Sequence, residues 1–353
     1  MDIDYGAPRD PGRLPAALAQ LPRGRAHQID VCYLNVNELE ILSDASLRPH
    51  DGSLHHLIGS WFWELDALPD RFLGQVARVD EVWAPTSFVR DALYASGASE
   101  VVVMPCVVEP VADPRLTRSD FGLPETGCMF FFHFDAHSTF ARKNPLGVIE
   151  AYRRAFRVSE RGSAVHLVMK VLNLDRLPEA RAQLESELAS VGGILIEAEM
   201  ASSEIGALIS LGDVYISLHR AEGFGLGIAE AMYFGRPVIA TAYSGPVDFL
   251  TQTNSCMVGY ETRVIAPGDL YLNPGMEQIY QSGHRWVEPD VGQASRWMKL
   301  LAHRPEQRAQ RGMRGSETIR RSFNSVTVGS AIRNRLIALR DGVGAESTSL
   351  PAR

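Results

Sequence analysis

Two glutamates separated by seven residues, with glycines between them, form the segment of this chain best suited to ligand chemistry. From position 213 to position 241 the sequence predicts a strand, a glycine-rich turn, a helix and a second strand. Glycines let backbone N–H groups approach a ligand closely, and the positive N-terminal end of a helix favours an anion. The segment is therefore typical of a pyrophosphate site. It contains Glu222, Gly223, Phe224, Gly225, Leu226, Gly227 and Glu230.

The two carboxylates restrict the anion that this turn would bind. Glu222 ends the first strand, at the carboxyl edge of the predicted sheet, where open α/β folds bind ligands. Glu230 lies in the first turns of the helix and points back to the same crevice. Two negative charges repel a free phosphate, but both accept hydrogen bonds from hydroxyl groups. We therefore expect a ligand of the form sugar–pyrophosphate–nucleoside.

The elements that must position these residues alternate between strands and helices, which predicts an α/β fold with parallel sheets. The segment 108–118 has two prolines and no apolar period, so it is expected to link two domains. The segment 260–289 is expected to be a long connection, and 255–258 the last strand. The predicted strands are 29–34, 57–62, 81–84, 101–104, 128–134, 165–171, 194–197, 213–218, 237–241 and 255–258, and the helices are 87–96, 145–156, 177–191, 202–211, 228–234 and several after 291. Expected helix caps are Ser87, Asn144 and Ser202 or Ser203.

Composition excludes several other classes of protein. The net charge of −7 argues against a basic nucleic-acid footprint, and no run of about 18 apolar residues would span a membrane. The four cysteines are far apart and form no C-x-x-C pair, so they are expected to be reduced thiols rather than zinc ligands. We expect no metal and no cofactor. The predicted location is the cytoplasm, and attachment to the inner face of the membrane stays open.

An ordered set of motifs resembles glycosyltransferase family 4, a group of retaining enzymes with the two-domain GT-B fold. Glu222 and Glu230 match the E-x7-E motif of this family, and Tyr243-Ser244-Gly245 matches its Y-S-G. The resemblance covers residues 55–335 and is specific as an ordered set, whereas the glycines alone would be weak evidence. Its other pieces are the segments 58–65, 82–89, 142–145 and 286–290.

This resemblance implies a role for each site residue. Glu230 would bind the ribose hydroxyls, and Glu222 would lie beside the transferred sugar. The family holds the donor phosphates with an Arg five positions before a Lys; here Lys143 matches the Lys, but Ser138 occupies the Arg position. Arg142 or Lys170 is expected to take its place. The implied catalytic residues are Glu222, Lys143 and Arg142, and the implied donor-binding residues are Glu230, Gly223, Phe224, Gly225, Leu226, Lys170, His219, Ser244 and Gly245, with His219 equally consistent with a packed core histidine.

The resemblance also implies two Rossmann-like domains that face a cleft. The family opens its first domain with a strand and a glycine-rich loop, and neither is found before position 29, so the first domain is expected to be incomplete and the cleft open on the acceptor side. The expected divisions are an irregular lead-in at 1–28 with one short helix at 14–21, a partial N-terminal domain at 29–111, a nucleotide-sugar-binding domain at 112–305, helices that cross back at 306–340 and a disordered tail at 341–353.

The predicted function is transfer of a hexose, such as mannose or glucose, from a nucleoside diphosphate sugar to a glycan or lipid-linked acceptor, with retention of configuration. One alternative is a nucleotide-sugar-binding protein that is inactive or depends on a partner, because the first domain is short. A second alternative is an NAD-dependent dehydrogenase, because Gly223, Gly225 and Gly227 resemble a dinucleotide fingerprint. That fingerprint needs an acidic residue after the next strand, where this chain has Ala240-Thr241-Ala242.

Overall fold

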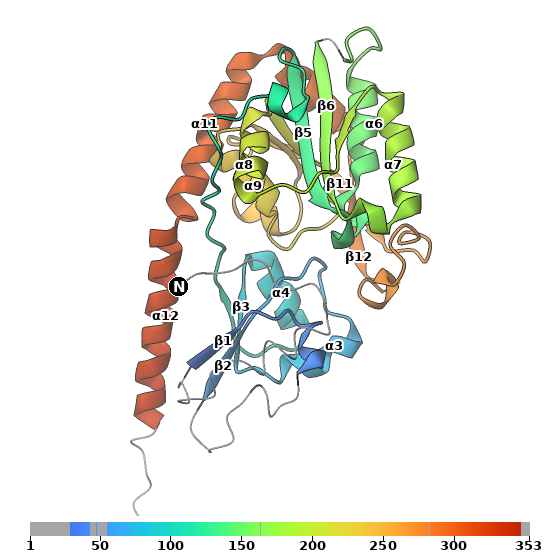
Figure 1. Ribbon diagram of the computed structural model, residues 1–353. Coiled ribbons are helices and arrows are strands. Elements are labelled where there is room, and N and C mark those ends of the chain that lie inside the picture. The colour runs from blue at the N-terminus through green and yellow to red at the C-terminus, as the bar shows by residue number, and fades with distance from the viewer. Residues whose placement is uncertain (1–28, 43–46, 48–54, 163, 282, 347–353) are drawn as a thin grey trace, which may run out of the picture.

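The N-terminal domain is built on a four-stranded parallel sheet (Figure 1). The computed structural model describes residues 29–42, 47, 55–162, 164–281 and 283–346. The strands lie in the order β1-β2-β3-β4, and helices α3 and α4 precede and follow β3 in the chain. The bounds are β1 Ile29–Cys32, β2 His56–Ser60, α3 Asp70–Val76, β3 Glu81–Ala84, α4 Ser87–Ala95 and β4 Val101–Val103.

The C-terminal domain contains a six-stranded parallel sheet in the order β10-β9-β8-β5-β6-β7. The two longest strands, β5 and β6, are almost continuously apolar and buried, as expected for central strands covered by helices on both faces. The bounds of this domain's elements are β5 Cys128–Asp135, α5 Phe140–Lys143, α6 Pro145–Ala155, β6 Val165–Leu172, α7 Pro178–Ser190, β7 Ile194–Ile196, α8 Ser202–Leu211, β8 Val214–Ser217, α9 Leu226–Tyr233, β9 Val238–Thr241 and β10 Cys256–Val258.

Two of the predicted helix caps were wrong. Helix α4 is capped by Thr86, whose hydroxyl accepts a hydrogen bond from the backbone N–H of Val89, whereas Ser87 binds Asp248 of the other domain. Helix α8 follows Ala201, whose backbone N–H donates to the carboxylate of Glu204. The cap predicted at Asn144 is confirmed, because its side chain accepts from Gly147 N. Helix α3 was not predicted.

The segment 260–289 is not a structureless connection, and β10 is not the last strand. Strands β11 (Tyr260–Val264) and β12 (Arg285–Pro289) pair antiparallel. The loop between them contacts both domains, because Leu272 packs in the C-terminal core and Leu270 and Tyr280 pack in the core of the N-terminal domain. Within this loop, Asn273 accepts a hydrogen bond from Phe140 N at 2.7 Å and donates to Ala136 O at 3.0 Å. The loop therefore supports the short helix α5, which carries Arg142 and Lys143.

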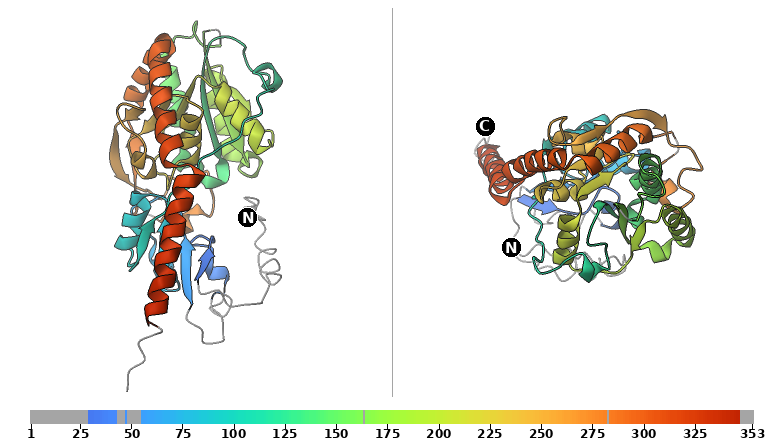
Figure 2. Two further views of the ribbon diagram at one scale, coloured as in Figure 1. Left: turned by 90° about the vertical axis from the view of Figure 1, so that its left-hand side faces the viewer. Right: turned by 90° about the horizontal axis from the view of Figure 1, so that it is seen from above.

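Three helices complete the fold: α10 Val291–His303, α11 Pro305–Ser322 and α12 Ser325–Glu346. Helix α11 runs beside the C-terminal domain and α12 beside the N-terminal domain, so the two helices extend along the molecule (Figure 2). Helix α12 extends to Glu346, into the segment 341–353 that was predicted to be a disordered tail, and the predicted helix at 14–21 lies outside the described residues. None of the described helices is long and apolar enough to cross a membrane. The apolar contact of α12 joins Ile332, Leu336 and Leu339 to Ile58, Trp83 and Met104.

An ion pair fixes α12 to the N-terminal sheet. Arg335 Nη2 lies 2.6 Å from Glu81 Oε2, and the Glu81 side chain is fully buried. Trp83 Nε1 donates to the other carboxylate oxygen at 2.7 Å. Burial opposes ionisation of Glu81, but these donors outweigh it, and the pKa of the carboxyl group lies below its ordinary value.

The two domains contact each other beside the glycine-rich turn. The hydroxyl of Thr86 in the N-terminal domain donates to Gly223 O at 2.8 Å. Gly223 packs so closely on the backbone of Trp63 that a Cβ atom there would lie 2.8 Å from Trp63 O. The buried core of the N-terminal domain also includes Ala221 and Trp286 of the C-terminal domain. The turn after β8 is therefore held from both domains.

Candidate active site

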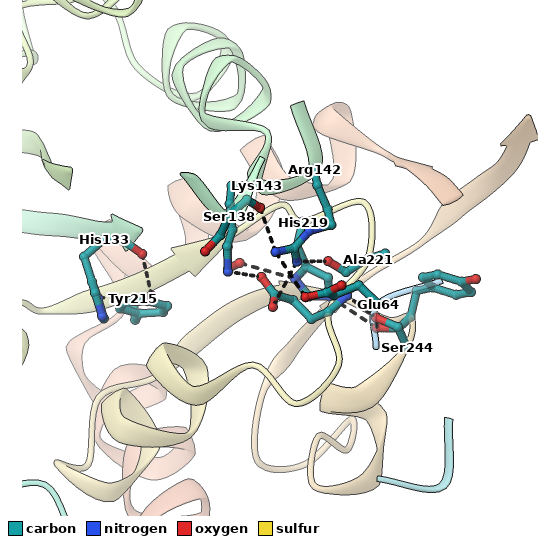
Figure 3. A network of polar contacts seen from close by, with 12 residues as sticks. Glu64, His133, Ser138, Arg142, Lys143, Tyr215, His219, Ala221 and Ser244 are labelled. Carbon is teal, nitrogen blue, oxygen red and sulfur yellow. Dashed lines mark hydrogen bonds and ion pairs between the residues drawn. The ribbon is translucent and has the colours of Figure 1, made fainter. Parts of the chain in front are cut away.

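A cavity of about 600 Å³ lies where the two domains meet. Its floor is formed by the carboxyl ends of β5, β6 and β8, the edge at which parallel α/β sheets bind ligands. The N-terminus of α9 and the glycine-rich turn form one wall. Figure 3 shows the polar contacts between side chains beside this cavity.

Glu222 is held by two cations. Lys143 Nζ lies 2.5 Å from Glu222 Oε1, and Arg142 Nη1 lies 3.2 Å from Glu222 Oε2. Burial alone would raise the pKa of Glu222, but Lys143 and Arg142 outweigh burial and lower it to about 2. Glu222 is therefore a carboxylate at neutral pH. Burial lowers the pKa of Lys143, and Glu222 opposes that shift.

Arg142 connects the two domains rather than facing a ligand freely. Its guanidinium donates to Ala221 O at 2.8 Å and to Ser138 O at 2.7 Å (Figure 3). Nη2 also lies 3.6 Å from Glu64 Oε1 in the N-terminal domain, and the side chain is only 2% exposed. With these partners in place, Arg142 positions Glu222 and has little capacity left for a phosphate.

The backbone around α5 is unusual. Thr139 before the helix and Asn144 after it have φ angles of 72° and 54°, in the left-handed region that non-glycine residues rarely adopt. Ser244 has a φ of 62°. Such conformations cluster at functional sites because the surrounding structure holds them in place.

Three of the predicted donor-binding residues support the site from behind. The hydroxyl of Ser244 accepts a hydrogen bond from Glu222 N at 2.8 Å, and Gly245 N donates to Glu222 O at 2.9 Å. His219 is fully buried; one ring nitrogen lies 3.2 Å from Ser217 Oγ and the other 3.2 Å from Tyr243 O. Burial lowers the pKa of His219 to about 4, so the ring is neutral. None of the three lines the cavity among the described residues.

Glu230 lies beside His133, which is set apart from Arg142 and Lys143 (Figure 3). Its environment is largely buried, which raises the pKa of its carboxyl group to about 7. His133 Nε2 lies 3.9 Å away. Burial lowers the pKa of His133 to about 4, so this neighbour is also neutral. Ligand hydroxyls that donate hydrogen bonds to this carboxyl group would favour its charged form.

Lys170 is a third cation at the cavity, after Lys143 and Arg142. It is 1% exposed on β6, beside His133 in the strand register, and Nζ contacts Val171 O at 3.5 Å. Burial lowers the pKa of its amine, and Glu199 and Asp135 oppose that shift. Lys170 lines the cavity together with Lys143.

The glycine-rich turn sets the close approach of α9 to the sheet. Gly225 precedes the helix with a φ of 86°, which suits glycine. A Cβ atom on Gly227 would lie 2.6 Å from Tyr215 Oη and 2.8 Å from His133 Cε1. The first N–H groups of α9 therefore reach the cavity, where they favour an anion.

The structure thus brings most of the predicted residues to one cavity: Glu222, Gly223, Phe224, Gly225, Leu226, Glu230, Arg142, Lys143 and Lys170. Sequence reasoning missed His133, Tyr215 and Glu64. Glu64 directly follows Trp63 in an aromatic segment, and a charged residue at that place was a signal, whereas His133 and Tyr215 lie within apolar strands and gave no signal.

These features define the GT-B fold: two α/β domains with parallel sheets and a cavity between them. The fold is shared with HepE from Anabaena in complex with UDP and glucose, at a TM-score of 0.65 and 14% identity, over 88% of this chain and 78% of that one. It is also shared with sucrose-phosphate synthase from Thermosynechococcus elongatus, at a TM-score of 0.64 and 14% identity, over 93% of this chain and 77% of that one.

Within this class, residues 139–262 match the family described as Glycosyl transferases group 1. The chain therefore carries a group 1 glycosyl transferase domain, which includes Lys143, Glu222 and Glu230. A curated relative, trehalose synthase from Rubrobacter xylanophilus, is 34% identical over 109 residues. The match covers 29% of this chain and only 26% of that relative.

Proposed function

We propose that this protein transfers a sugar from a nucleoside diphosphate sugar to an acceptor, with retention of anomeric configuration. The observation that carries the proposal is the arrangement around one cavity: the Lys143–Glu222 pair on one side, Glu230 on the other and the N-terminus of α9 beside them. The group 1 domain match covers all of these residues.

The donor would lie across the cavity with its two hydroxyl-rich ends at the two glutamates. Glu230 accepts hydrogen bonds from the ribose, and Glu222 from the transferred hexose. The diphosphate lies between them, near the N-terminus of α9 and the amines of Lys143 and Lys170. A structural relative in complex with UDP and glucose supports this choice of ligand.

In the reaction, the bond between the anomeric carbon and the diphosphate oxygen breaks, and negative charge develops on the departing nucleoside diphosphate. Lys143, Lys170 and the dipole of α9 stabilise that charge, which is the main electrostatic task of such a site. Arg142 keeps Glu222 ionised and in place. The acceptor hydroxyl attacks the face that the diphosphate leaves and passes its proton to the departing diphosphate oxygen, so configuration is retained. We favour glucose or mannose as the hexose.

The test is a screen of UDP-, GDP- and ADP-sugars by thermal shift, because a ligand that binds the folded state raises the melting temperature. Glu230→Gln should reduce the shift strongly, whereas Glu317→Gln, on the exposed face of α11, should leave it unchanged. We also expect binding and turnover to persist in EDTA, because Lys143, Lys170 and the N-terminus of α9 supply the positive charge beside the diphosphate. Loss in EDTA, restored by magnesium or manganese, would contradict metal-independent transfer.

A second candidate function is donor binding without efficient turnover. It is favoured by the fact that Lys143 and Arg142 are both already paired with Glu222. An assay of nucleoside diphosphate release, with the donor found in the screen and with or without acceptors, distinguishes the transferase from a donor-binding protein. Acceptor-dependent turnover of about 1 per second or faster supports the transferase.

A further inference from the structure

Two side chains of the N-terminal domain reach the cavity. Among the described residues that line it, only Phe62 and Glu64 belong to the segment from β1 to β4. They follow β2 and are two positions apart. Trp61, before them, is 0% exposed, and Trp63, between them, is 2% exposed. Successive side chains here therefore point alternately to the core and to the cavity.

Phe62 presents its ring to the cavity. It is 40% exposed although both neighbouring tryptophans are buried, and its backbone N–H donates to Asn35 Oδ1 at 2.7 Å. A large exposed aromatic ring in a concave site is suited to ligand contact rather than to the core. The hydrogen bond to Asn35 fixes the backbone that carries the ring.

Glu64 supplies a carboxylate on the same side. Tyr280 Oη donates to Glu64 Oε2 at 3.0 Å, and Arg142 Nη2 lies 3.6 Å from Glu64 Oε1. Four lone-pair positions on a carboxylate leave room for hydroxyl donors beyond these two partners. The charges of Glu64 and Glu222 are balanced by Arg142 and Lys143, so no excess positive charge faces this side.

The position of this pair relative to the donor follows from Arg142. One guanidinium contacts both Glu222 and Glu64, so Phe62 and Glu64 adjoin the end of the cavity where the transferred sugar would lie. Glu230 lies beside His133, which is set apart from that end (Figure 3). A second substrate placed between the described part of the N-terminal domain and the transferred sugar would therefore lie beside Phe62 and Glu64.

We propose that Phe62 and Glu64 form a subsite for a pyranose ring of the acceptor, an inference that rests on the proposed function. The C–H groups on one face of a pyranose are apolar and complement the negative face of the Phe62 ring. Hydroxyls at the ring edge donate to Glu64. The group that accepts the sugar is therefore a neutral sugar unit, and a phosphate headgroup placed here would meet a carboxylate.

The test first establishes donor binding to the full chain by thermal shift with UDP-, GDP- and ADP-sugars. Saturation-transfer NMR then measures contact with methyl α- and β-pyranosides of glucose, mannose, galactose and N-acetylglucosamine, and with dodecyl phosphate as a lipid-phosphate probe. With the best saccharide as acceptor, Phe62→Ala should raise the KM for saccharide about ten-fold or more, and Glu64→Gln should raise it similarly, while donor affinity changes by less than about two-fold. Phe62→Tyr keeps the ring and should retain most of the saccharide affinity.

The matched control is Leu73→Ala on α3, which removes a side chain of the same domain with a similar exposure of 39% outside the cavity. The inference is overturned if no saccharide contacts a protein that binds donor, if dodecyl phosphate contacts it and saccharides do not, or if Phe62→Ala behaves like Leu73→Ala. Absence of any donor-induced shift instead overturns the proposed function.

Discussion

Glu230 is partly buried beside a neutral histidine, and the proton on its carboxyl group is therefore an indicator of ligand binding. Because the pKa of its carboxyl group is raised from 4.5 to about 7, the folded protein holds a proton on Glu230 that the unfolded chain releases. The stability due to this proton is complete below pH 4.5 and is lost as the pH rises through 7. A ligand that binds the carboxylate must displace the proton.

We expect the affinity for a nucleoside diphosphate sugar to increase about ten-fold between pH 6 and pH 8. The donor itself has no ionisation in this range, because both of its phosphates are esterified. Calorimetry at several pH values measures the effect, and Glu230→Gln should bind weakly with no such dependence. The same variant should be more stable than the natural protein at pH 8, by up to about 3 kcal/mol. A flat pH profile for the natural protein would contradict the ribose role of Glu230.

Lys143 provides a second test at the scale of single residues. Lys143→Ala should weaken binding of a nucleoside diphosphate by about ten-fold or more and leave nucleoside binding nearly unchanged, because only the charged part of the ligand loses its partner. Lys299→Ala, on the exposed face of α10, is the matched control. Equal losses for nucleoside and diphosphate would make Lys143 a structural residue that only holds Glu222.

At the scale of elements, the helix that follows the glycine-rich turn depends on its close contact with the sheet. Gly227→Ala would place a methyl group against Tyr215 and His133 and force both side chains into the cavity. We expect weaker donor binding and a stability loss of about 1–3 kcal/mol. Gly329→Ala on α12 is the control, because a Cβ atom there meets nothing within 4 Å. Unchanged donor affinity in Gly227→Ala would show that the ligand lies elsewhere.

The elements that sequence predicts well are those with strong periodicity. Strands β5 and β6 and helix α6 were predicted within one residue at each end, because their apolar patterns and the Asn144 cap are local signals. Strands β11 and β12 were missed: β11 is mostly exposed, so it lacks an apolar face that would mark it as a strand. Helix α3 has only seven residues and contains Gly74.

The candidate site was predictable where the motif is contiguous and not where it depends on distant contacts. Glu222 and Glu230 follow from their spacing within one strand–turn–helix unit. The commitment of Arg142 to Glu64 joins residues far apart in the chain, and the packing of His219 depends on Tyr243 O. Neither contact has a local signal in the sequence. Arg142 was therefore predicted to bind phosphate, and the role of His219, as a ligand-binding or a core residue, stayed open.

At the scale of the whole molecule, the ion pair between Arg335 and Glu81 joins α12 to the N-terminal sheet. Arg335→Met leaves the buried carboxylate of Glu81 without its cation, and we expect a loss of about 2–4 kcal/mol. Glu81→Gln combined with Arg335→Met should recover most of that loss, because the buried charge is then removed as well. Urea unfolding followed by tryptophan fluorescence measures both, and equal losses in the single and double variants would contradict this account.

The return of α12 to the first domain also has a consequence for synthesis on the ribosome. A face of the N-terminal sheet, with Ile58, Trp83 and Met104, is covered by residues of the final described helix. Domains usually fold as units while the chain emerges. The N-terminal domain is synthesised before the C-terminal domain. One apolar face of its sheet stays uncovered until the C-terminal domain has been translated and α12 has left the ribosomal exit tunnel. We therefore expect a chaperone to cover this face of the nascent chain during that interval. The C-terminal domain lies later in the sequence, but it is the first domain whose elements have all been synthesised.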